Sequence, residues 1–176
     1  SFSFPVEKIK EGYYTDAYFM RSEEILNGDN YHPRVLMQVF ARDHVVVCGT
    51  DEVIALIRQC AFHPETIEIH SLRDGEEVDE WETVMTIEGD YADFAHLETI
   101  YLGILARQSR IATNVRRVVK AANGKPVLFF PARYDIYQTQ ESDGYAALVG
   151  GIHGFSTDAN ALAAGGKGLG TIPHAL

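Results

Sequence analysis

Four segments in the first half of the chain have the apolar and polar pattern of β-strands. Each is rich in β-branched or large apolar residues, and the third also alternates between apolar and polar positions. The segments cover residues 34–41, 44–49, 65–72 and 81–89. Arg42-Asp43 separates the first two, and Asp74-Gly75 is a turn signal between the last two. We therefore expect turns at both dipeptides.

Other segments have apolar residues at helical spacing. Val53, Ile54, Ile57 and Cys60 recur on one face and predict a helix within residues 51–62. A helix is also predicted after Thr15, with Asp16 in its first turn. Similar apolar spacing predicts helices through residues 93–108 and 109–124. The last of these ends at Asn123-Gly124, which is a helix stop.

The C-terminal third alternates strand and helix, which is typical of a parallel α/β sheet. Residues 127–130 (VLFF) form an apolar run expected of a strand buried on both faces. Helix is expected at 143–150, a strand at 151–155, a helix capped by Ser156 or Thr157 at 156–165, and a strand at 171–176. The predicted fold class is α/β. An N-terminal α/β domain (1–122) is followed by the first strands of an incomplete α/β barrel (123–176), whose sheet is left open.

Ligand-binding residues of parallel α/β sheets lie at the carboxyl ends of the strands. Arg133 follows the first predicted strand of this region, Ser156 follows the second, and His174 lies at the end of the third. We therefore expect the three side chains at one rim, pointing into a common pocket.

Composition narrows the function classes. The 176 residues include 25 acidic and 15 basic side chains, a net charge of −10, which argues against a general binder of nucleic acid or anionic membranes. No apolar run approaches transmembrane length. Cys48 and Cys60 lie in apolar surroundings and are expected to be reduced thiols of a cytoplasmic protein. The histidines lack metal-ligand spacing, so no protein-held metal site is predicted.

A longer stretch, residues 84–130, resembles the segment that leads into the barrel of the type II phosphoribosyltransferases, the family of nicotinate and quinolinate phosphoribosyltransferase. Three further motifs resemble the nicotinate branch: YYTDAYF (13–19), GGIHGFS (150–156) and GTIPHAL (170–176). The motifs occur in the family's order and span nearly the whole chain. Members of the family are about twice this length. The resemblance therefore implies that this chain is the front half, inactive when isolated.

The resemblance also implies an irregular TIM-like barrel after the N-terminal domain, and a reaction. Nicotinate and phosphoribosyl pyrophosphate give nicotinate mononucleotide and pyrophosphate in NAD biosynthesis, usually coupled to ATP. Mg²⁺ would bind the pyrophosphate, with ligands mostly outside this chain, and a head-to-tail homodimer would share its active sites. Two alternatives remain: a quinolinate phosphoribosyltransferase, which also decarboxylates its product, and a non-catalytic binding module.

Individual roles follow from the matching motifs. Tyr18 would stack on the pyridine ring from the neighbouring subunit, and His174 would be phosphorylated by ATP. Arg133, Gly154, Ser156 and Thr171 would bind substrate. Helical arginines would contact phosphate, namely Arg107, Arg110 and Arg117.

Plainer roles stay open for the same residues. Tyr18 could be a core aromatic, Ser156 a helix cap, and Arg133 the ion-pair partner of Asp135 or Glu141. The sequence around Arg133, FFPARYD, departs from the family pattern, which leaves the pyridine substrate open. The glycines of GGKGLG (165–170) follow a predicted helix rather than a strand, so we do not expect a dinucleotide or P-loop site there.

Overall fold

The computed structural model describes residues 2–170 and 172–175. The helices are α1 (Val6–Lys10), α2 (Ala17–Gly28), α3 (Thr50–Cys60), α4 (Tyr91–Phe94), α5 (Glu98–Ala121), α6 (Gln140–Gly150) and α7 (Asp158–Ala161). Four 3-10 helices are η1 (Pro64–Thr66), η2 (Ala95–Leu97), η3 (Tyr137–Thr139) and η4 (Leu162–Ala164). The strands are β1 (Arg34–Phe40), β2 (Val45–Val46), β3 (Glu68–Ser71), β4 (Glu77–Val78), β5 (Thr83–Asp90), β6 (Leu128–Phe129) and β7 (Gly154–Phe155). The predicted mixed α/β class is confirmed.

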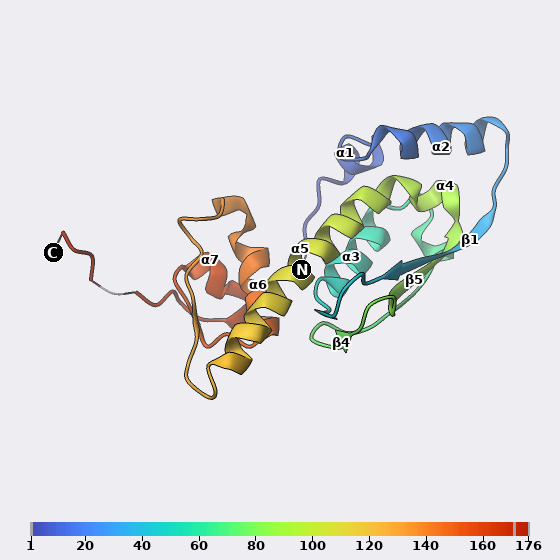
Figure 1. Cartoon of the computed structure of the whole chain (residues 1–176). Coiled ribbons are helices and arrows are strands. Elements are labelled where there is room, and N and C mark those ends of the chain that lie inside the picture. The colour runs from blue at the N-terminus through green and yellow to red at the C-terminus, as the bar shows by residue number, and fades with distance from the viewer. Residues whose placement is uncertain (1, 171, 176) are drawn as a thin grey trace.

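Helix α5 runs through two lobes of the molecule (Figure 1). We call residues 2–97 the sheet lobe, because they contain the antiparallel sheet β1-β5-β3. Residues 122–170 form the strand-pair lobe, which contains the parallel pair of β6 and β7 with α6 and α7. The predicted domain boundary at residue 122 stays a prediction. Among the described residues, no helix combines the length and the apolar character needed to cross a bilayer.

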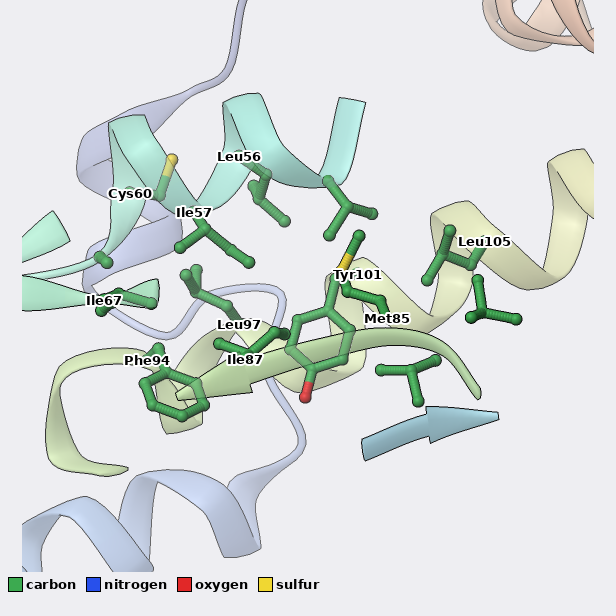
Figure 2. Packing of buried hydrophobic residues seen from close by; sticks show 14 of the residues in the cluster. Leu56, Ile57, Cys60, Ile67, Met85, Ile87, Phe94, Leu97, Tyr101 and Leu105 are labelled. Carbon is green, nitrogen blue, oxygen red and sulfur yellow. The ribbon is translucent and has the colours of Figure 1, made fainter. Parts of the chain in front are cut away.

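The main hydrophobic core lies between one face of the sheet and helices α3 and α5 (Figure 2). Leu56 of α3, Ile87 of β5 and Tyr101 of α5 are almost completely buried. Ile87 pairs across the sheet with Met37 of β1 on one side and with Ile69 of β3 on the other. Because side chains alternate along a strand, these paired residues point to one face of the sheet. Each fully buried side chain contributes roughly 1.5–3 kcal/mol.

The predicted strand at 44–49 is largely wrong, and Arg42-Asp43 does not join two strands that pair with each other. β2 is only two residues long and pairs with β4, whereas β1 pairs with β5. The backbone N–H of Val46 donates to the hydroxyl of Thr113 at 2.9 Å, and that of Cys48 donates to Ser109 at 3.1 Å. Side chains of α5 therefore satisfy these two backbone N–H groups, in addition to the short pairing of β2 with β4. Both cysteines are buried and free, as predicted.

The two helical segments predicted for residues 93–124 form mainly one helix. α5 spans 24 residues without a break, and α4 and η2 precede it. It ends where the sequence predicts, since Asn123 and Gly124 have φ angles of 48° and 82°. Asp90 caps α4 by accepting a hydrogen bond from the backbone N–H of Ala92.

The strand-pair lobe confirms the predicted order of strand, helix, strand and helix, with two corrections to its strands. Leu128 and Phe130 are each 48% exposed, so the first strand is short and not buried on both faces. Of the two predicted caps of α7, Thr157 is the one observed, and it accepts from the backbone N–H of Asn160. Residues 172–175 contain no strand, and residues 171 and 176 of that predicted strand lie outside the described residues. The described residues therefore contain two parallel strands of the expected barrel.

Glycines allow α6 to approach its neighbours closely. A Cβ atom on Gly144 would overlap the backbone carbonyl of Asn160 in α7. A Cβ on Gly150 would lie 2.6 Å from a methyl group of Val115 in α5. Neither position has room for a larger residue without a shift of the backbone.

We expect Gly144→Ala to lower the free energy of unfolding by roughly 2–4 kcal/mol, because the new methyl group must push α6 away from α7. Gly103→Ala is the matched control, since Gly103 lies within α5 with nothing within 4 Å of its Cβ position. That substitution should be neutral or stabilising by up to about 1 kcal/mol. Urea denaturation of both variants tests the packing, and equal effects would contradict it.

Candidate functional site

Tyr18 lies in the first turn of α2, where its ring is exposed. It is 58% accessible, and its ring centroid lies 4.1 Å from that of the buried Phe19. The alternative role as a core aromatic therefore does not fit Tyr18, whereas it fits the buried Phe19. An exposed aromatic ring supported from behind offers a flat surface for stacking another ring.

Hydrogen bonds fix the start of α2 on the start of α5. The hydroxyl of Thr99 donates to the carboxylate of Asp16 at 3.0 Å and accepts from the backbone N–H of Asp16 at 3.1 Å. Thr15 donates to the carbonyl of His96 at 2.6 Å. These contacts join segments more than eighty residues apart in sequence, so the position of Tyr18 is defined by α5.

Carboxylates surround Tyr18. The pKa of its phenol is raised, first by desolvation and then by the negative charges of Glu98 and Asp16. Burial also raises the pKa of Glu98. The group formed by Tyr18, Asp16, Glu98 and Thr99, which we call the tyrosine cluster, therefore offers a stacking surface and hydrogen-bond acceptors but no cation.

The second predicted group lies at the carboxyl ends of β6 and β7. Gly154 pairs with Leu128 in the parallel ladder, and a Cβ there would lie 2.6 Å from Leu169. The backbone N–H of Ser156 donates to the carbonyl of Phe129 at 3.1 Å, and its buried hydroxyl oxygen has no hydrogen-bond partner among the described residues. An unpaired buried hydroxyl is costly in a complete structure, so this rim has unused hydrogen-bonding capacity.

The structure brings only part of the predicted rim together. Arg133 lies in an exposed turn after β6, and the described residues provide no ion-pair partner for it, neither Asp135 nor Glu141. His174 lies in an exposed turn rather than at a strand end, so the expected row of three strand ends is not formed by the described residues. Thr171 lies outside them. The ligand roles of all these residues stay predictions.

The arginines of α5 have two kinds of surroundings. Arg107 donates from Nε and Nη2 to the two carboxylate oxygens of Asp143 in α6, at 2.9 and 2.8 Å. Arg110 and Arg117 instead line a surface groove together with Arg42. Arg107 is thus held in an intramolecular ion pair, whereas Arg110 and Arg117 face outward.

Mg²⁺ was expected to be held mainly by residues outside this chain. Among the described residues, no three His, Cys, Asp or Glu side chains lie close enough together to hold a metal ion. No step of the chemistry is therefore assigned to a metal held here. The residues that sequence reasoning missed are Thr99 and Glu98 in the tyrosine cluster and Arg42 in the groove, each brought in by tertiary contacts.

Comparison with known proteins identifies the family. The model of the quinolinate phosphoribosyl transferase N-terminal domain matches residues 16–109. The structure of nicotinate-nucleotide pyrophosphorylase from Pyrococcus furiosus superposes on the whole chain with a TM-score of 0.87 and 34% identity. This chain covers 46% of that protein, less than half its length.

Two more distant structures share the fold. Human nicotinic acid phosphoribosyltransferase matches 92% of this chain with a TM-score of 0.77 and 16% identity, and 40% of its own length is covered. NadC from Streptococcus pyogenes matches 78% of this chain with a TM-score of 0.62 and 17% identity, and 52% of its length is covered.

We expect Asp143→Ala to destabilise the fold by roughly 2–4 kcal/mol, because it removes a buried acceptor of Arg107 and of the Thr139 hydroxyl. Asp135→Ala is the control, since its exposed carboxylate lies 3.6 Å from the same guanidinium. That substitution should cost less than about 0.5 kcal/mol. Thermal or urea unfolding measures both. A loss for Asp143→Ala no larger than that for Asp135→Ala would contradict a structural role for Arg107.

Proposed function

Because the chain belongs to the quinolinate phosphoribosyl transferase N-terminal domain family, we propose that it is the N-terminal part of a phosphoribosyltransferase acting on quinolinate. The reaction joins quinolinate to the ribose of phosphoribosyl pyrophosphate. It releases pyrophosphate and carbon dioxide and yields nicotinate mononucleotide for NAD biosynthesis. The match of the family model to residues 16–109 is the observation that carries this proposal.

The Pyrococcus furiosus relative supports the same chemistry. Its name describes cleavage of nicotinate nucleotide by pyrophosphate, which is the reverse of phosphoribosyl transfer to a pyridine nitrogen. At 34% identity over the whole of this chain, it supports a pyridine nucleotide as the product here. Since the chain spans 46% of that relative, the complete activity requires residues beyond those present here.

The chemistry explains which residues this chain contributes. Positive charge develops on the ribose as pyrophosphate leaves, and the pyridine nitrogen already has the lone pair that attacks, so no general base is needed. Catalysis then depends on positioning and electrostatics. An exposed tyrosine ring, fixed by Thr99 and Asp16, can align a pyridine ring by stacking.

The tyrosine cluster cannot bind the pyridine carboxylates by itself, because its charged groups are Asp16 and Glu98. A guanidinium such as that of Arg133 is the natural partner for a carboxylate. Within one chain the two lie at different positions along α5. The tyrosine cluster lies at Thr99, at the start of the helix, whereas the turn that carries Arg133 lies beside Arg107, because Asp135 is 3.6 Å from the Arg107 guanidinium. A rise of about 1.5 Å per residue places Arg107 roughly 12 Å along the helix from Thr99.

The separation supports an active site shared between two copies of the protein. In a homodimer, the tyrosine cluster of one protomer would cover the strand-end rim of its partner. Gly154 and the unpaired hydroxyl of Ser156 would then face the substrate at that rim. The rest of the barrel would add the groups that bind ribose and pyrophosphate.

A second candidate is nicotinate phosphoribosyltransferase coupled to ATP. The motifs TDAY and GTIPHAL favour it, because they resemble the nicotinate branch. His174 is exposed and so could accept a phosphoryl group, and a neutral imidazole nitrogen is a competent nucleophile. Nicotinate has no second carboxylate to lose, so release of carbon dioxide separates the two candidates.

We expect the full-length protein that contains this chain to convert quinolinate labelled in its 2-carboxylate into nicotinate mononucleotide. The assay contains phosphoribosyl pyrophosphate and Mg²⁺, and one labelled carbon dioxide should be released per product molecule. Turnover of nicotinate that requires ATP and releases no carbon dioxide would favour the second candidate. Turnover of neither pyridine would overturn the proposal.

In the same assay we expect Tyr18→Ala to lower kcat/KM about tenfold or more, because the stacking surface is lost. Tyr31→Ala is the matched control, since Tyr31 is 62% exposed and lies beyond the end of α2. Equal activity of the two variants would contradict the role of the tyrosine cluster.

A further inference from the structure

Two buried polar atoms face each other between α2 and η2 without a hydrogen-bond partner among the described residues. They are Oε2 of Glu23 in α2 and Nδ1 of His96 in η2, and they lie 3.7 Å apart. The His96 side chain is fully buried, and that of Glu23 is 14% exposed. Buried polar atoms without a partner are rare in native proteins, so the way in which this pair is satisfied needs an explanation.

The second ring nitrogen of His96 defines where the protons lie. Nε2 is 3.0 Å from the backbone carbonyl of Cys60, at the end of α3. A carbonyl only accepts hydrogen bonds, so Nε2 carries a hydrogen, and Nδ1 of a neutral ring is then an acceptor. An ionised Glu23 is also only an acceptor. The two facing atoms therefore repel each other unless a proton lies between them.

Titratable groups of helices α1 to α5 surround this pair, namely Lys10, Glu24, Cys60, Asp93 and Glu98. Asp93 has a partner of its own, since its carboxylate lies 2.7 Å from Nδ1 of His63. The ammonium group of Lys10 lies over the ring of Phe62, 5.9 Å from its centroid. Among the described residues, the glutamate of the pair therefore has no ionic partner other than the histidine.

Desolvation and charge both favour a neutral pair. Burial raises the pKa of Glu23, and the negative charges of Glu24 and Asp93 raise it further. Burial also lowers the pKa of His96, although its hydrogen bond to the Cys60 carbonyl and the charge of Asp93 act in the opposite direction. An ion pair at this position would require two charges to be desolvated. The proton is therefore held by Glu23, whose carboxyl group donates to Nδ1.

His96 contacts both ends of the segment that carries Tyr18. Its carbonyl accepts a hydrogen bond from the hydroxyl of Thr15 at 2.6 Å, and its ring faces Glu23, five residues after Tyr18. α2 lies at the periphery of the sheet lobe (Figure 1), and among the described residues of this helix Phe19 alone is buried. The polar contacts to His96 therefore carry much of the docking of α2.

We propose that Glu23 and His96 are positioning residues for Tyr18. The proton that they share docks α2 on η2 and thereby fixes the direction of the exposed tyrosine ring. The consequence for catalysis rests on the proposed function, because it requires Tyr18 to stack on the pyridine ring. The docking of α2 does not rest on that function and has its own test.

The pH dependence of the docking follows from the two shifts. Because the pKa of Glu23 is raised, its contribution is complete below the ordinary pKa of a glutamate, about 4.3, and is lost as the pH rises through the raised value. Because the pKa of His96 is lowered, its contribution is complete above the ordinary pKa of a histidine, about 6.5, and is lost as the pH falls. Glu23→Gln separates the two contributions, since an amide donates to Nδ1 at every pH.

Hydrogen exchange of the full-length protein, compared between variants at the same pH, tests the docking. At about pH 4, amides of residues 19–26 in Glu23→Gln should exchange within about twofold of the wild-type rate. In Glu23→Ala they should exchange at least about tenfold faster, because Nδ1 has lost its donor. Between about pH 4 and pH 8, the rate in the wild type relative to Glu23→Gln should rise about tenfold. Glu24→Gln removes the same charge from the adjacent exposed position, so it should follow the wild type within about twofold.

Two results of this experiment would overturn the proposal. If Glu23→Gln exchanges as fast as Glu23→Ala at both pH values, no hydrogen bond to Nδ1 holds α2. If the ratio of the wild-type rate to the Glu23→Gln rate is independent of pH, Glu23 does not hold the proton.

The positioning role has a kinetic test in the assay described above, at about pH 6. Glu23→Ala should raise the KM for the pyridine about tenfold and leave the KM for phosphoribosyl pyrophosphate within about twofold, whereas Glu23→Gln should match the wild type within about twofold. An unchanged KM for the pyridine in Glu23→Ala, or equal increases in both KM values, would overturn the positioning role. If the full-length protein turns over neither pyridine, the proposed function fails, and the exchange rates still decide whether the shared proton docks α2.

Discussion

The structure depends on the burial of helix α5 from two directions. Tyr101 and Leu105 belong to the core beneath the sheet, whereas Val115 belongs to the core of the strand-pair lobe. Ala112 lies in a third cluster that joins Val46 of β2 to Ala146 of α6. One helix thus shares its apolar side chains among three cores, and elements of both lobes pack on it.

Local patterns predicted most of the elements, because side-chain periodicity reflects burial directly. The apolar, β-branched content of β1 and β5, the alternation in β3 and the helical spacing in α3 and α5 all gave the right structure. The pairing of β2 could not be predicted, since its backbone is satisfied by the hydroxyls of Ser109 and Thr113, more than sixty residues away. Hydroxyl side chains on a helix give no local sign of such a partner.

The candidate site was predictable to a similar extent. The motif around Tyr18 identified an exposed aromatic, but the carboxylate of Glu98 beside it and the anchor at Thr99 depend on tertiary contacts. The arginines of α5 were grouped together in the sequence, although tertiary contacts pair Arg107 with Asp143 of α6 and leave Arg110 lining the groove. The sequence alone could not show that Arg107 is held in an ion pair whereas Arg110, among the described residues, is not.

Helix α5 is a single cooperative element shared by both lobes, and native-state hydrogen exchange tests that directly. Backbone amides of residues 101–119 should all exchange with the free energy of global unfolding, the same value as amides in the centre of β5. Exchange of residues 112–119 at a clearly lower free energy than residues 101–108 would contradict the account, because the strand-pair lobe and its half of α5 would then open independently of the sheet.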